Sequence, residues 1–95
     1  MDAMRRVHVI VAGDVQGVGY RYTMRLEARA LGVTGWVRNR ADGTVEAEVE
    51  GTAEQVDAAL AWMAQGPPGS RVSGARVTEL SPTATGSSFD VLPTA

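Results

Sequence analysis

The sequence contains no cysteine, no lysine and only one histidine. The absence of cysteine excludes disulfides, thiolate catalysis and cysteine-ligated metal sites, so we expect a fold that is indifferent to redox conditions. Because all nine basic residues are arginine, any single cation used in binding must be a planar guanidinium, a group that pairs well with oxyanions. A GC-rich genome is the simpler explanation of this bias and involves no function.

Long hydrophobic runs and an excess of positive charge are also missing. No stretch of about 20 apolar residues is present, so we expect no transmembrane helix. The apolar run at 7–12 alternates and ends at a glycine, which is typical of a strand rather than a signal peptide, and we expect a cytoplasmic protein. A net charge of −2 and 5% aromatic residues do not favour nucleic-acid binding.

The length and composition fit one small globular domain. The chain has 95 residues, 44% of them hydrophobic, with no repeat or low-complexity segment, so we expect a single domain over 1–95. We also expect the protein to be a monomer. The spacing of apolar residues changes along the chain and indicates where the elements lie. In order, they are a strand at 7–12, a helix at 20–31, a hairpin of strands at 33–40 and 44–50, a helix after Thr52, a strand at 72–80 and a short terminal strand at 89–92.

This order is typical of a ferredoxin-like βαββαβ sandwich. In that α+β fold, two helices pack on one face of a mostly antiparallel sheet. Gly32 is well placed to end the first helix in a left-handed conformation. Thr52 is a candidate N-cap of the second helix, and Gln55 three residues later completes a fair capping box.

The hairpin predicts where Asn39 points. A three-residue loop at 41–43 sets Arg38 opposite Glu46, a favourable cross-strand pair, and turns Asn39 to the buried face. The alternative is that Asn39 only caps the turn. The second strand carries glutamates at alternate positions, 46, 48 and 50; they are too widely spaced for one metal ion, so we expect a solvated face and no metal site.

Three glycines, Gly13, Gly17 and Gly19, separate the first strand from the first helix. Backbone amides of such a loop form an anion-binding concavity, and the helix N-terminus adds unpaired N–H groups and partial positive charge. Arg21 follows at the start of the helix, where its guanidinium can pair with two phosphate oxygens. The alternative is an ordinary tight turn with Arg21 in solvent, and spacing alone does not decide between the two. His8 lies in the first strand, and we expect it on the wet face rather than acting as a base.

Two segments resemble the acylphosphatase family. Residues 13–21 read GDVQGVGYR, similar to the signature G-x-V-Q-G-V-x-F/Y-R, and residues 35–46 read GWVRNRADGTVE, similar to G-W-V-R-N-x-x-D-G-x-V-E. Residues 66–72 resemble a third, less diagnostic segment. The resemblance runs from about Val7 to Phe89. The tail departs from it, because 91–95 lacks the basic and aromatic ending common in the family and leaves the pairing of the last strand open.

The resemblance implies a ferredoxin-like fold and a metal-independent hydrolase of acyl phosphates, with no organic cofactor. Its small-molecule substrate would be an acyl phosphate, and inorganic phosphate would be both product and competitive inhibitor. It makes Arg21 the phosphate-binding arginine and Asn39 the residue that positions the water. It places the backbone phosphate cradle at Gln16, Gly17, Val18, Gly19 and Tyr20.

Two other functions remain as hypotheses. The same loop would serve a non-catalytic module that binds carbamoyl phosphate or another anion. Residues 17–22 faintly resemble an RNA-recognition strand motif, but such a motif must lie on a strand with its aromatic rings outward, and here it spans a loop and a helix start.

Overall fold

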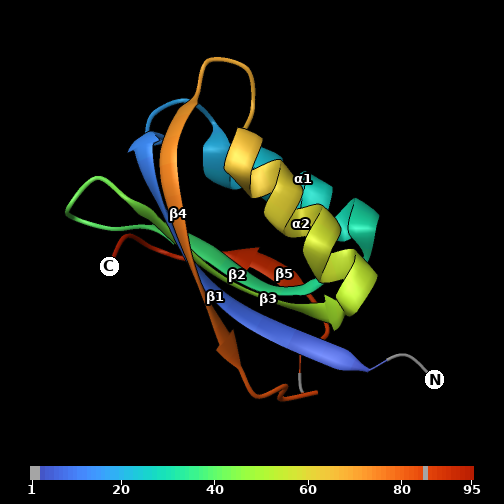
Figure 1. Ribbon diagram of the computed structural model, residues 1–95. Helices are drawn as coiled ribbons and strands as arrows, with labels where there is room; N and C mark the ends of the chain where they lie inside the picture. Colours follow the sequence, from blue (N-terminus) through green and yellow to red (C-terminus); the bar gives the residue numbers. More distant parts are fainter. Residues whose placement is uncertain (1–2, 85) are drawn as a thin grey trace.

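Two helices lie side by side on one face of a five-stranded sheet (Figure 1). This computed structural model describes residues 3–84 and 86–95. The arrangement confirms the ferredoxin-like α+β sandwich that the sequence predicts. The elements are β1 (Met4–Asp14), α1 (Tyr20–Leu31), β2 (Thr34–Asn39), β3 (Val45–Thr52), α2 (Ala53–Gln65), β4 (Arg71–Leu80) and β5 (Phe89–Val91).

The sheet has the strand order β4-β1-β3-β2-β5. All neighbours are antiparallel except β2 and β5, which run parallel and pair Gly35 with Phe89 and Val37 with Val91. The structure thus answers the question that the atypical tail left open. Strand β1 is longer than predicted and includes Gly13 and Asp14, which we expected in the loop, because β4 continues to pair with them.

The ends of both helices follow from their capping residues. Gly32 has φ 84°, and its N–H donates to the carbonyls of Ala28 and Arg29, so the predicted left-handed end of α1 is confirmed. At the start of α2, Gln55 N–H donates to Thr52 Oγ1 at 3.2 Å, and Thr52 N–H donates to Gln55 Oε1 at 2.9 Å. Both halves of the predicted capping box are therefore formed.

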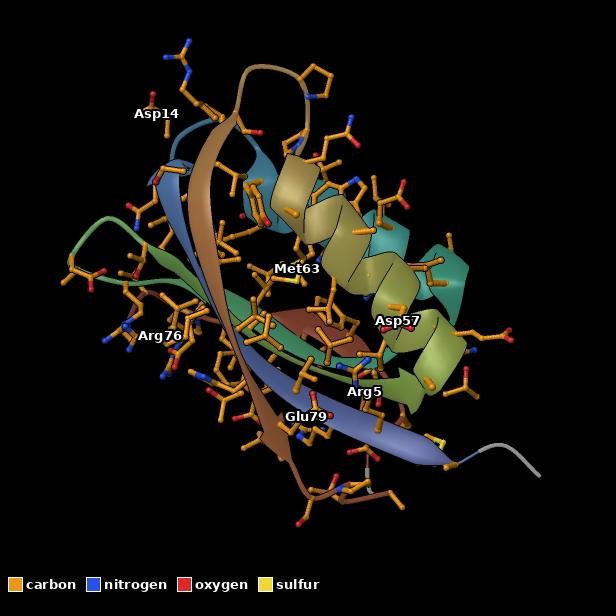
Figure 2. The ribbon with its side chains drawn as sticks, viewed as in Figure 1. Arg5, Asp14, Asp57, Met63, Arg76 and Glu79 are labelled. Atoms are coloured by element: carbon orange, nitrogen blue, oxygen red, sulfur yellow. The ribbon has the colours of Figure 1, made fainter. Side chains whose placement is uncertain are left out.

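The core lies between the sheet and the helices. Val7, Val9 and Val11 of β1 are completely buried and face the helices, and Met63 reaches from α2 toward the sheet (Figure 2). At the edge of this layer, Arg5 joins α2 to β4, donating to Asp57 at 2.6 Å and to Glu79 at 2.9 Å (Figure 2). These ion pairs are exposed and add little stability. The valine-rich packing holds the helices on the sheet and so fixes the position of the β1–α1 loop.

The hairpin register agrees with the sequence prediction. Arg38 lies opposite Glu46, and its Nε donates to Glu46 Oε1 at 2.7 Å. Asn39 pairs with Val45, whose side chain is fully buried on the helix side of the sheet. Because directly paired residues share a face, Asn39 also points toward the helices.

Glu50 corrects the expectation of a solvated acidic face. Its side chain is only 2% exposed. It accepts hydrogen bonds from the N–H groups of Thr83 and Ala84 at 2.9 and 2.8 Å and from Arg6 at 3.1 Å. The alternation of residues along β3 correctly predicted that Glu50 lies on the sheet face away from the helices. The segment after β4, however, folds over the end of that face and covers Glu50. The Thr83 N–H contributes most to holding the pKa of Glu50 at about 2, and Ala84 and Arg6 also lower it, against the opposing effect of burial.

Replacing Glu50 with Gln is expected to destabilise the fold. A carboxyl whose pKa falls from 4.5 to about 2 on folding contributes about 3 kcal/mol at neutral pH. Since the folded pKa is the lower one, this contribution is present above about pH 5 and is lost as the pH falls toward 2. The free energies of unfolding of wild type and variant, measured with urea, should therefore differ most at neutral pH. The difference should become smaller in acid.

Glu48→Gln is the matched control, because Glu48 also pairs with Arg6 but its side chain is 25% exposed, against 2% for Glu50. It should cost less stability at pH 7. A Glu50→Gln effect that stays constant down to about pH 2 would contradict this account of Glu50.

Candidate active site

The β1–α1 loop is built by glycines with positive φ. Gly17 has φ 75° and Gly19, the N-cap of α1, has φ 78°. L side chains rarely adopt this conformation, and a Cβ at Gly17 would meet open space, so backbone conformation rather than crowding requires glycine there. Single left-handed residues within a turn are the geometry that forms anion-binding concavities from successive N–H groups.

The backbone amides of this loop are free. Helix α1 has no side-chain N-cap and no acidic residue in its first turn. Its first backbone bond runs from Thr23 N–H to Gly19 O at 3.0 Å. Within the described residues, no N–H group from Gln16 to Tyr22 donates to a protein acceptor. Free N–H donors at a helix N-terminus, together with the helix dipole, favour negative charge beside them.

The side chain of Gln16 joins this loop to the β2–β3 hairpin. Gln16 Nε2 donates to the carbonyl oxygens of Arg40 and Thr44, at 2.8 and 2.9 Å. Arg40 directly follows Asn39, so one amide side chain ties the loop to the strand end that carries Asn39. The family resemblance implied only a backbone role for Gln16, and a contact between positions 24 residues apart leaves no local pattern that could have predicted this one.

Asn39 carries an unsatisfied polar atom. Its side-chain Oδ1 is buried and has no hydrogen-bond partner in the described part of the chain. A buried acceptor without a partner costs about 1–3 kcal/mol, so such atoms are uncommon in native structures and call for an explanation. The alternative that Asn39 caps the turn finds no support, since Asp42 accepts the turn bonds from Thr44 N–H and Oγ1.

One small pocket brings the predicted site residues together. It has a volume of about 190 Å³, and its wall joins the β1–α1 loop, the start of α1 and the end of β2. Of the predicted residues, Gln16 and Val18 do not line it: Gln16 reaches the hairpin, and Val18 packs against the core. The lining residues are Val15, Gly17, Gly19, Tyr20, Arg21, Tyr22 and Asn39.

Arg21 and Tyr22 lie together at this pocket. The guanidinium carbon of Arg21 is 5.5 Å from the centre of the Tyr22 ring, and no acidic side chain in the described residues pairs with Arg21. The Tyr22 side chain is prominent on the surface, with 55% of its area exposed. Nothing in the local sequence pattern singled out Tyr22, since exposed aromatic residues have no periodic signal.

Two titratable groups near the site have structural roles. The Tyr20 hydroxyl donates to Met63 O at 2.7 Å, and burial raises the pKa of this phenol, so it stays protonated. His8 Nε2 donates to Glu46 Oε2 at 2.7 Å on the sheet face away from the helices, where we expected it. Across residues 3–84 and 86–95, no three His, Asp or Glu side chains are grouped to hold a metal ion, and no helix is long and apolar enough to cross a membrane.

The fold and the pocket together define an α+β sandwich with a small pocket beside the N-terminus of α1, at one end of its sheet. Residues 7–91 match the model of the acylphosphatase family. The acylphosphatase of Methylococcus capsulatus is 55% identical over 89 residues, covering 94% of this chain and 97% of the relative. The chain belongs to the acylphosphatase family.

Solved structures agree with this assignment. The crystal structure of acylphosphatase from Bacillus subtilis superposes with a TM-score of 0.89 at 34% identity, covering 95% of this chain and 99% of that one. An acylphosphatase from Coxiella burnetii gives a TM-score of 0.88 at 35% identity, covering 94% and 93%. Family membership supports the hydrolysis of acyl phosphates as the activity.

Proposed function

We propose that this protein hydrolyses acyl phosphates to a carboxylate and inorganic phosphate, acting as a monomer without a metal ion. Arg21 and the backbone amides of 16–20 bind the phosphate, and Asn39 positions the attacking water. The observation that carries the proposal is the shared pocket. There, an unpaired guanidinium and free amide donors meet the one buried asparagine oxygen that lacks a partner in the described residues.

Binding of the phosphate uses donors that are already in place. The transition state of phosphoryl transfer is loose and spreads negative charge over the non-bridging oxygens. Free N–H groups and a guanidinium stabilise that charge without reorganising, which is the main source of electrostatic catalysis. The planar fork of Arg21 matches two of these oxygens.

Asn39 supplies the acceptor for the water. Its Oδ1 would accept a hydrogen bond from the attacking water and aim a lone pair of the water oxygen at phosphorus. The new bond joins the water oxygen to phosphorus, and the bond from phosphorus to the acyl oxygen breaks with its electron pair. The carboxylate leaves with that pair, and the water proton passes to an oxygen of the phosphate formed.

The substrate makes a general acid unnecessary. The leaving group is a carboxylate whose conjugate acid has a pKa of roughly 4 to 5, so it departs unprotonated. The pocket fits this requirement, because Arg21 and the loop amides can stabilise charge and Asn39 can position the water. A phosphate ester, with its poorer leaving group, would need a proton donor as well.

The direct test is hydrolysis of benzoyl phosphate, followed by its absorbance, with a chelator present throughout. We expect turnover that inorganic phosphate inhibits competitively, since substrate and product share the amide cradle. Phosphate binding without any hydrolysis would reject the enzyme and favour the non-catalytic anion-binding module instead.

A further inference from the structure

Beyond the pocket, a second arginine lies against the same exposed ring. Arg25 is one turn of α1 after Arg21, about 6 Å further along the axis. Its guanidinium carbon is 5.6 Å from the centre of the Tyr22 ring, against 5.5 Å for Arg21. The ring therefore contacts two cations, one that lines the pocket and one that lies outside it.

Arg25 makes no ion pair with any other described residue. Its Nε is buried without a hydrogen-bond partner among the described residues, and no acidic side chain there pairs with it. Elsewhere in the chain the half-buried arginines are paired, Arg6 with Glu48 and Glu50, and Arg38 with Glu46. Like charges four residues apart on a helix also repel. The repulsion between the guanidinium groups of Arg21 and Arg25 is thus unfavourable in the free protein. Binding of anions to them reduces this repulsion.

Arg25 lies just beyond the pocket, next to the Tyr22 ring that lines it. Among the lining residues that carry a side chain, Tyr22 is the exposed one. An acyl group that extends from the pocket along this ring therefore comes close to Arg25. The phosphate neutralises Arg21, which leaves Arg25 free to contact a second negative charge on the acyl group.

We propose that Tyr22 and Arg25 form a subsite for the acyl group that selects acyl phosphates carrying a second anionic group. This inference rests on the proposed function and narrows its substrate class. Tyr22 contributes a surface along which the acyl group lies, and Arg25 contributes a guanidinium for its distal carboxylate or phosphate. Both are specificity-determining residues and take no part in bond cleavage.

Non-hydrolysable phosphonates separate this subsite from catalysis. We would compare 4-carboxybenzylphosphonate with its neutral counterpart 4-carbamoylbenzylphosphonate by calorimetry at low ionic strength. Wild type should bind the carboxylate form about tenfold more tightly, the effect of one charge-assisted contact. In Arg25→Gln the two affinities should become equal, with inorganic phosphate bound as in wild type, and Arg25→Lys should restore part of the preference.

Arg29→Gln is the matched control, since Arg29 is an exposed arginine one turn further along α1 and does not line the pocket. It should keep the wild-type preference. Equal binding of the two phosphonates by wild type, or an unchanged preference in Arg25→Gln, would overturn the subsite. Failure of wild type to hydrolyse benzoyl phosphate would instead reject the proposed activity, whatever the phosphonates show.

Discussion

Arg21→Gln is expected to lower kcat/KM for benzoyl phosphate by about 10³-fold, the size of effect seen when an arginine that stabilises phosphoryl transfer is removed. Glutamine keeps much of the length and polarity of the side chain but neither the charge nor the two-pronged donor. Because the same guanidinium binds the ground-state phosphate, the inhibition constant of inorganic phosphate should rise as well. Initial rates measured at several phosphate concentrations give both quantities.

Stability should change little in this variant, because Arg21 makes no ion pair with the described residues. Its guanidinium lies against the Tyr22 ring, which is itself exposed. Arg29→Gln serves as the control, since it removes the same charge from an exposed position of the same helix. Activity near the wild-type level in a folded Arg21→Gln protein would remove Arg21 from the mechanism.

Asn39→Ala should separate turnover from binding. Without the acceptor that aims the water, kcat should fall by about 10²- to 10³-fold. The phosphate cradle is left intact, so the inhibition constant of phosphate should remain within about twofold of wild type. A lost binding contact worth about 1.4 kcal/mol would raise that constant about tenfold. Thermal unfolding should show no loss of stability, because the change removes a buried polar atom that has no partner in the described residues.

A fall in both turnover and phosphate binding would instead make Asn39 a structural residue. Asn39→Asp provides the complementary measurement. It keeps the shape and an acceptor but places negative charge beside the bound phosphate, so it should weaken phosphate inhibition where Asn39→Ala does not. The two substitutions together distinguish positioning of water from support of the hairpin.

Much of this arrangement could be predicted because its causes are local. Helix α1 has the predicted bounds, since its apolar spacing and the glycine at its end are properties of adjacent residues. The face of Asn39 followed from the loop length and from the gain in placing Arg38 opposite Glu46. The glycine pattern likewise indicated a loop of free amides before the helix.

The features that could not be predicted join distant parts of the chain. The Gln16 side chain donates to the carbonyls on either side of the hairpin loop, more than 20 positions later. Glu50 is covered by residues more than 30 positions later. Neither contact produces any regular spacing. The sequence alone therefore determined the order of the elements, the capping of the helices and the glycine-rich form of the β1–α1 loop, because periodicity and backbone preference act over a few residues.

Only the tertiary structure decided which of these residues meet. It brought Arg21 and Asn39 to one pocket and left the Asn39 oxygen without a partner among the described residues. It also placed the Tyr22 ring next to Arg21 and Arg25, neither of which forms an ion pair within that part of the chain. These outcomes depend on how the helices pack across the sheet. That packing is set by the sum of many apolar contacts between segments far apart in the chain, and no short stretch of sequence carries it.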